Sequence, residues 1–489
     1  MSRPEAPGLI PMTITAEDKA AEIFVLDGNL NMAARGIGTL RTELPEGIYK
    51  IKLRAGADTR EDLVVHRAPR TDKQYPLLRF SSPAPLAFTL EGSPDHAEAA
   101  KRESHVVHVH RGAGSSIFVF ARDWVSGQGP GPSGLNPAED LHLESSAGGL
   151  LVDLETQSIR QDGVGGPWAA CTIELDPGPY RLSVRLSNGE VFVQSIVASP
   201  GWQTQVFMLQ RKDYRRTSGE ARPNLGSAAI LMSRDMGFDP DAPSARVAEL
   251  ARQGLVNRRP VLSNETREML RQKAYGPMLG IFAGHLLLQE PPADLSLLTL
   301  VVQNLRILLG APHPDVEALA LAAGVSTDFS FAMPPMLRRS WSCVVEASAK
   351  RPELVPAESL ASRLFLKLTN QDPWLVWREQ GQDTEHELVE NFTEVLKRLI
   401  ERPGGLKEVA ASIARHAREE SAGGHGGLLG GVVRTLEQAA AGVTGDPSRR
   451  PSALVPASIM EALVESLGIP RSSVEAMIDQ GLRRLKIEG

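Results

Sequence analysis

Two stretches, LPEGIYKIKL at residues 44–53 and LDPGPYRLSV at residues 175–184, decide the fold of the first half of this chain. In each, apolar and polar residues alternate after a turn that contains Pro or Glu beside Gly, which is the period-two pattern of a strand with one buried face. Gly47 and Gly178 stand at the same place, directly before the strand, where a turn favours a residue without a Cβ. The sequence therefore predicts the same element twice.

The similarity between the two copies extends in both directions. Upstream, AEIFVLD at residues 21–27 matches SSIFVFARD at residues 115–123, and downstream EDLVVHRAP at residues 61–69 matches EVFVQSIVASP at residues 190–200. The second copy carries an insertion that includes VSGQGPGPSGLNP at residues 125–137, which Pro and Gly mark as a loop. Short strands separated by turns favour an antiparallel sandwich or small barrel, so we expect two copies of one β unit.

The phrase L-x-P-G-x-Y-x-L-x-V, followed by the hairpin SNGEV at residues 187–191, resembles a group of β-sandwich modules. These are the transthyretin-like, carboxypeptidase-regulatory-like and PEGA-type modules, and the resemblance covers residues 13–70 and 105–209. The first copy departs from it, because Pro45 and Glu46 stand in exchanged order. The resemblance implies interaction and spacer domains and no catalytic residue.

After residue 212 the composition changes. Residues 210–227 form a polar linker with Gly and Pro, and the chain beyond them is rich in Ala and Leu with repeated helix boundaries. We predict helices at residues 244–254, 263–275, 294–310, 315–323, 336–350, 357–370 and 385–401.

The predicted fold class is multidomain α+β, with duplicated antiparallel β-sandwich-like modules in the N-terminal half and an all-α helical C-terminal half. The expected domains are a first β module at residues 1–92, a second β module with a Gly/Pro-rich insertion at 93–212, a helical domain at 225–380, and a C-terminal helical region with flexible breaks at 381–489.

Composition excludes several classes of protein. The 489 residues are 42% hydrophobic, and 53 basic and 59 acidic residues give a net charge of −6, so no large positive field favours general nucleic-acid binding. Cys171 and Cys343 fit no disulfide framework or zinc motif and are expected to be buried thiols in a reducing compartment.

Targeting signals are also missing from the sequence pattern. The N-terminus shows no signal-peptide pattern, and the longest apolar runs, 278–288 and 295–309, are too short or too polar for a bilayer span. We therefore expect a soluble cytoplasmic protein without a membrane partner.

Few motifs in the sequence are of a kind that carries chemistry. HVVHVH at residues 105–110 places His108 and His110 on one face of a predicted strand, an arrangement that metal sites use, but nothing marks further ligands. Gly129, Gly131 and Gly134 spell G-x-G-x-x-G, yet prolines interrupt it and no helix pattern follows. The sequence predicts no catalytic residue, no cofactor and no metal, with His108 and His110 as the weak metal candidates.

The C-terminal region holds two further predictions. The segment at residues 458–486 resembles a helix-turn-helix, as in the final domain of sigma-type factors, and would place at the DNA Arg471, Ser472, Ser473, Arg483 and Arg484. Acidic Glu475 and Asp479 oppose this interpretation, so a helical hairpin that docks on a partner or on the preceding domain stays the alternative, and DNA is an unlikely partner.

Three functions follow from these patterns. The leading one is a non-catalytic adaptor or scaffold that binds protein partners, of unknown identity, through paired β modules and a helical domain. The first alternative is a regulated effector or substrate of a caspase-like protease in a bacterial defence pathway, cleaved in flexible segments after residue 415, with the candidate cleavage residues Arg415, Arg418, Arg434, Arg449 and Arg450. The second is a transcription regulator that uses the terminal helix pair.

Overall fold

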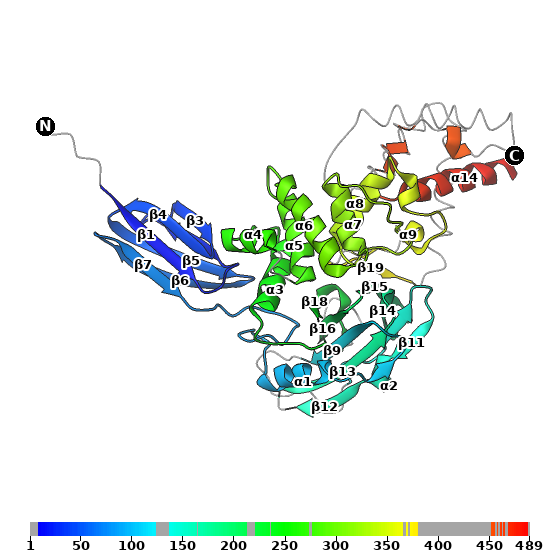
Figure 1. Cartoon of the computed structure of the whole chain (residues 1–489), viewed down its shortest axis with the longest axis horizontal. Helices are drawn as coiled ribbons and strands as arrows, with labels where there is room; N and C mark the ends of the chain where they lie inside the picture. Colours follow the sequence, from blue (N-terminus) through cyan, green and yellow to red (C-terminus); the bar gives the residue numbers. More distant parts are fainter. Residues whose placement is uncertain are drawn as a thin grey trace. The chain divides into compact units, whose positions relative to one another are not determined.

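The computed structural model describes residues 8–123, 136–163, 165–212, 221–234, 236–272, 276–364, 368–369, 372–379, 451–454, 457, 460–461, 463–464 and 468–487. Within these ranges, β-sheets occupy the N-terminal half and helices dominate the C-terminal half (Figure 1), so the α+β class is confirmed at this level. The chain forms two compact units, Met1–Val184 with Ile196–Leu319, and Arg185–Ser195 with Ala320–Gly489. The predicted domain boundary between residues 380 and 381 lies outside the described residues.

Seven strands form the first sheet: β1 (Leu9–Ala16), β2 (Glu22–Leu26), β3 (Met32–Ile37), β4 (Thr39–Pro45), β5 (Gly47–Ala55), β6 (Asp58–His66) and β7 (Thr71–Tyr75). Their order in the sheet is β6-β5-β2-β3-β4-β1-β7. Neighbouring strands run antiparallel except β1 and β7, which are parallel. The prediction of a purely antiparallel module is wrong for this pair, because the chain between β1 and β7 is long enough for a parallel crossover.

The two ends of the first sheet are joined by side chains. The Tyr75 hydroxyl on β7 donates to Asp62 Oδ2 on β6 at 2.8 Å. His66 Nε2 lies 3.0 Å from the carbonyl oxygen of Ile10 and 3.2 Å from that of Leu44, and Nδ1 lies 2.8 Å from the Thr71 hydroxyl. The sheet therefore folds over a core whose fully buried side chains include Ile14, Ile23, Val25, Ile51 and Leu53.

A connector at residues 76–93 and the helix α1 (Pro94–Ser104) lead to the second β region. One of its sheets has the order β12-β13-β9-β16-β17, with β8 on β13 and β18 on β16. The strands are β8 (Val109–His110), β9 (Ser115–Asp123), β12 (Ile159–Gly163), β13 (Gly166–Leu175), β16 (Trp202–Lys212), β17 (Ala221–Pro223) and β18 (Ala229–Arg234), with the short helix η1 (Leu225–Ser227) before β18. The sheet thus continues beyond residue 212, where we expected the module to end.

Parallel pairs occur in this sheet as well. β16 runs parallel to β9, and β8 runs parallel to β13. The second β region is therefore mixed rather than antiparallel. In the same unit, β10 (Leu141–Ser145) pairs antiparallel with both β11 (Leu150–Asp153) and β14 (Gly178–Arg185), and the helix α2 (Leu154–Gln157) follows β11.

The repeated element is present at both predicted places. β5 begins at Gly47 and β14 begins at Gly178. The Tyr49 hydroxyl donates to the carbonyl oxygen of Pro45 at 3.0 Å, and the Tyr180 hydroxyl donates to that of Asp176 at 2.8 Å. In both copies the tyrosine hydroxyl thus forms a hydrogen bond with the turn four residues upstream, as in the tyrosine corner of β-sandwich proteins.

The longer correspondence between the copies is not reproduced in the strand order. β2 lies beside β5 in the first sheet, whereas β9, its expected counterpart, belongs to a different sheet from β14. The recurring turn, strand and tyrosine contact are therefore observed, and the duplication of a whole module stays a prediction.

Five helices follow in sequence: α3 (Pro243–Val256), α4 (Asn264–Arg271), α5 (Pro277–Leu288), α6 (Leu295–Leu309) and α7 (Pro314–Ala322). The predicted helix starts at residues 263 and 294 are N-caps, because Ser263 Oγ accepts the Thr266 N–H at 3.1 Å and Asp294 Oδ1 accepts the Leu297 N–H at 3.0 Å. Gly310 ends α6 in the left-handed conformation with φ of 67°. Local sequence signals thus fixed these helix ends correctly.

The second unit contains α8 (Arg338–Ser348), η2 (Pro352–Leu354), α9 (Leu360–Arg363), β19 (Val376–Arg378), η3 (Pro451–Leu454) and α14 (Arg471–Ile487). It also contains the first five residues of β15 (Val191–Ala198), which pair antiparallel with β19. Val191, Val193, Leu364 and Trp377 form a buried cluster there. The C-terminal half is therefore not all-α as predicted.

One predicted helix in this unit is shorter than expected. The helix expected at residues 357–370 extends only over α9, because Leu368 pairs with Trp377 in extended backbone. Trp341, Trp374 and Trp377 are buried and form part of the core of this unit. Among the helices that the structure describes, none is long and apolar enough to cross a bilayer.

Candidate functional site

The side of β6, β5, β2 and β3 that points away from the core is here called the outer face. Along β5, Tyr49, Ile51 and Leu53 are buried, while Ile48, Lys50, Lys52 and Arg54 alternate with them and point outward. The pairing register then aligns the outward residues of neighbouring strands into rows, since residues directly opposite each other share one face.

One end of the outer face is apolar. The apolar patch consists of Leu26, Met32, Ile48, Leu63 and Val65. Ile48 lies opposite Val65, Leu26 lies opposite Met32, and Lys50 stands between Leu63 and Leu26 in the next row. The exposed fractions are 73% for Leu63, 62% for Ile48, 54% for Met32 and 51% for Val65. Large aliphatic side chains therefore lie in water side by side on a sheet face.

The rest of the outer face carries charge. Lys50 Nζ and Lys52 Nζ lie 2.6 and 3.8 Å from the carboxylate of Glu61, and the hydrogen bond from Lys50 lowers the pKa of Glu61. Arg35, in the same row as Lys52 and Glu61, and Arg54, in the next row, bind Glu22 at 2.8 and 2.6 Å. Both guanidinium groups also lie over the ring of Phe24, 5.3 and 5.0 Å from its centroid.

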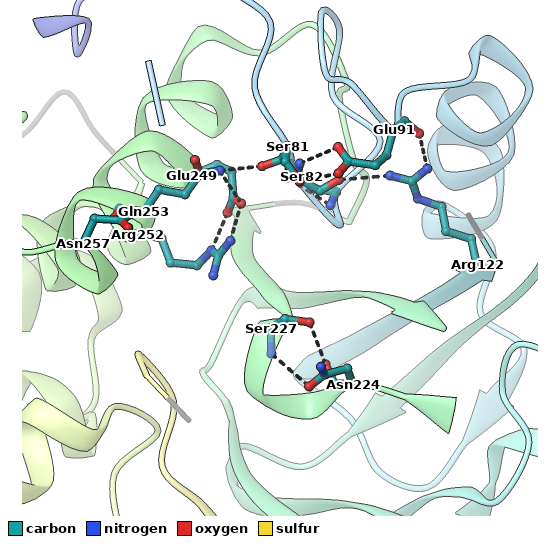
Figure 2. Close-up of polar contacts among 11 residues, drawn as sticks. Ser81, Ser82, Glu91, Arg122, Asn224, Ser227, Glu249, Arg252, Gln253 and Asn257 are labelled. Atoms are coloured by element: carbon teal, nitrogen blue, oxygen red, sulfur yellow. Dashed lines mark hydrogen bonds and ion pairs between the residues drawn. The ribbon is translucent and has the colours of Figure 1, made fainter. Parts of the chain in front are cut away.

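The connector that follows this sheet is held by a buried arginine of β9. Arg122 is fully buried and donates through Nε to the carbonyl oxygen of Pro83 at 3.1 Å. Its Nη2 donates to the carbonyl oxygen of Ser82 at 3.1 Å, and its Nη1 donates to that of Glu91 (Figure 2). Burial lowers the pKa of Arg122 to about 10. The guanidinium group thus bridges two separate points of the connector.

His96 of α1 completes this site. Its Nε2 donates to the carbonyl oxygen of Gly166 at 3.0 Å, and its Nδ1 faces Arg122 Nη1 at 3.4 Å. Burial, and next the positive charge of Arg122, lower the pKa of His96 to about 4. The imidazole is therefore neutral at physiological pH.

Helix α3 also binds the first sheet and the connector through polar side chains. Arg246 forms a buried bidentate ion pair with Asp18, at 2.6 and 2.7 Å, and also donates to the carbonyl oxygen of Leu78. Gln253 donates to the carbonyl oxygen of Ser81 at 2.6 Å, and Figure 2 shows it beside the buried pair Glu249–Arg252. The first sheet is thereby fixed within its unit.

The histidines predicted as metal candidates are not brought together with further ligands. His108 Nδ1 accepts the Thr172 N–H at 2.9 Å, so its Nε2 carries the proton and donates to Glu103 at 3.1 Å. His110 is exposed and its Nδ1 lies 2.7 Å from Glu174 Oε2. Each histidine thus has its own carboxylate, and the described part of the chain contains no cluster of three or more metal-binding side chains.

The terminal helix begins in contact with the rest of the second unit. Ser472 and Ser473 are buried, the Ser473 hydroxyl donates to the carbonyl oxygen of Ser362, and Arg471 Nη1 donates to that of Ala349 at 2.9 Å. This burial favours the docked hairpin over base contacts, and DNA binding stays an untested prediction. The side chains of Arg483 and Arg484, and the candidate cleavage residues Arg415, Arg418, Arg434, Arg449 and Arg450, lie outside the described residues.

Both thiols are poor nucleophiles. Burial raises the pKa of Cys171 to about 12 and, with a smaller contribution from Glu346, that of Cys343 to about 11. The two cysteines are free.

Sequence reasoning missed the apolar patch, although the signal was present. Ile48 stands in phase with Lys50 and Lys52, and Leu63 and Val65 flank the buried Val64. Comparison with models of known protein families finds no match to this chain, and a search of curated proteins finds none either. The arrangement of these residues therefore carries the functional argument.

Proposed function

We propose that this protein is a non-catalytic adaptor that binds protein partners, and that the apolar patch is one of its docking sites. The observation that carries the proposal is the exposure of Met32, Ile48, Leu63 and Val65 on one sheet face. Single exposed apolar residues are ordinary, but contiguous ones with charged neighbours mark interaction surfaces.

The contacts of the connector support this role. A docking surface loses less entropy on binding when it is already rigid, because fewer groups have to be ordered. Arg246 with Asp18, and Arg122 with the connector, join the patch-bearing sheet to α3 and to the second β region through buried charged groups. A partner bound at the patch is thus linked rigidly to the rest of this unit.

The proposal includes two finer points. The matching contacts of Tyr49 and Tyr180 support paired β-sandwich modules of the interaction and spacer type. The two free, protonated thiols support a reducing, cytoplasmic location and a protein that does not use cysteine as a nucleophile.

The test compares tagged full-length proteins recovered from native cells, with quantitative mass spectrometry of what co-purifies. The variant L63S/V65S removes the centre of the patch, and L150S is the matched control, because Leu150 is a 62% exposed strand leucine that lies opposite Glu144 rather than an apolar residue. We expect a stoichiometric protein with the unmodified chain and with L150S, and at least about tenfold less with L63S/V65S. Equal recovery with all three proteins contradicts the proposal.

A further inference from the structure

The outer face has an ordered distribution of charge. Beyond Ile48, every outward position of β5 is a cation: Lys50, Lys52 and Arg54. Arg35 on β3 adds a fourth cation, and the carboxylates of these strands' outward positions are Glu22 and Glu61. The face thus has an apolar end and a basic end.

Each carboxylate on this face serves two cations. Glu61 is shared by Lys50 and Lys52, and Glu22 is shared by Arg35 and Arg54. Each carboxylate together with its two cations therefore has a net charge of +1 on this face. Asp27, at the end of β2, is engaged elsewhere, since its carboxylate accepts the N–H groups of Asn29 and Asn31 within the turn.

We infer that the partner bound at the apolar patch is a protein segment that carries apolar side chains followed by Asp or Glu. This inference rests on the proposed function and adds the chemistry of the partner. Successive outward rows of a strand lie about 7 Å apart. An extended segment that lies along β5 matches them with the pattern apolar-x-apolar-x-acidic-x-acidic, its carboxylates placed over Lys52 and Arg54.

Charge argues against two other occupants. A second copy of the same face would bring the unbalanced cations of both copies together, which costs energy at an interface. An anionic membrane would attract the patch but repel a chain whose net charge is −6. The outward positions of β2, β3, β5 and β6 also hold neither Trp nor Tyr, the residues enriched at membrane interfaces.

Two conservative variants have opposite expected effects. E61Q removes the carboxylate shared by Lys50 and Lys52 and thereby frees both cations for the partner. K50Q/K52Q removes the cations themselves. These side chains are 30 to 45% exposed, so the fold is retained, and equal thermal unfolding midpoints check this.

The experiment places a photocrosslinking amino acid at position 63 of the full-length chain in native-cell extract and measures the yield of the crosslinked protein. At 50 mM NaCl we expect about threefold more product with E61Q and about fivefold less with K50Q/K52Q, and added salt should reduce these differences. A crosslinker at position 150 is the control for random collisions.

The outcomes separate the two proposals. Capture of a protein whose yield falls with E61Q, or rises with K50Q/K52Q, overturns the acidic partner and leaves the adaptor standing. A product that contains only this chain's peptides identifies a self-contact, and a lipid adduct identifies a membrane, and each overturns the inference. Capture of nothing at position 63 beyond the level at position 150 overturns the docking site itself.

Discussion

Arg246 and Asp18 are 228 residues apart in the chain and form a buried bidentate ion pair, at 2.6 and 2.7 Å. Asp18 also accepts the Leu78 N–H at 3.0 Å, and Arg246 lies over the ring of Phe80, 4.6 Å from its centroid. One carboxylate thus joins the first sheet, the connector and α3.

D18N is expected to lower the free energy of unfolding by about 3 to 5 kcal/mol, because it leaves a buried guanidinium group without its counter-ion. Chemical denaturation measures the change. E265Q is the control, since Lys19–Glu265 is an exposed pair between the residue next to Asp18 and α4, and it contributes less than about 1 kcal/mol. If D18N and E265Q lower the free energy of unfolding by the same amount, the buried charge of Arg246 does not need the Asp18 carboxylate.

The stability of the first unit should depend on pH through His96. Its folded pKa, about 4, lies below the ordinary histidine value of 6.5, so the unfolded chain binds the proton more readily and stability falls as pH drops from about 6.5 to 4. The contribution lost over this window is about 3 kcal/mol, because the proton binds more weakly to the folded than to the unfolded chain.

The measurement for this prediction is urea unfolding of the unmodified protein and H96Q across the same window. The difference in free energy between them should shrink by about 3 kcal/mol as the pH falls. A constant difference for H96Q would mean that His96 is not neutral in the folded state.

Phe88 has a φ of 59° and is 58% exposed, although an aromatic residue disfavours the left-handed region. The backbone around it is held by hydrogen bonds from Ala87 N–H to Pro240 O at 3.0 Å and from Leu90 N–H to Phe80 O at 2.9 Å. F88G should therefore be more stable than F88A by about 1 kcal/mol, since only glycine relieves the strain.

The comparison for this prediction is made by thermal and urea unfolding. At Leu63, in the extended strand β6, the order should reverse, with L63A more stable than L63G. A stability order at position 88 that matches the order at position 63 would show that the left-handed conformation at Phe88 costs nothing.

The two thiols should resist alkylation in the folded protein. With pKa values raised to about 12 and about 11, both Cys171 and Cys343 are almost entirely protonated at pH 8. Iodoacetamide should react more than about a hundredfold more slowly than after unfolding, because the thiolate is the nucleophile. Intact-mass spectrometry before and after urea counts the adducts, and rapid labelling of native protein would contradict the raised pKa values.

Local features of the fold were predictable from sequence, because their causes are local. Gly47 and Gly178 begin the expected strands, Ser263 and Asp294 cap helices, and Gly310 ends one. Each of these residues acts through its own backbone or through an N–H a few positions away.

Features that join distant parts of the chain were not predictable. The parallel pairing of β1 with β7 and the addition of β18 to β16 depend on which surfaces meet, and so does the burial of Asp18 with Arg246. The apolar patch had only a partial sequence signal, the alternation within each single strand, for a related reason. Leu63 and Val65 read as ordinary strand residues until the register with Ile48 and Lys50 shows that they share the outward side.

The start of α14 has a consequence for the hypothesis of a proteolytic switch. Arg471 and Ser473 bond to backbone oxygens of Ala349 and Ser362, and Val474 and Ile478 of the same helix are buried. Hydrolysis of one peptide bond between residues 415 and 455 would therefore give a nicked molecule whose two pieces remain associated. Release of the C-terminal fragment then requires a competitor that displaces it from the surface of α8 and α9. The rate of release is limited by this exchange of the fragment and not by cleavage of the peptide bond.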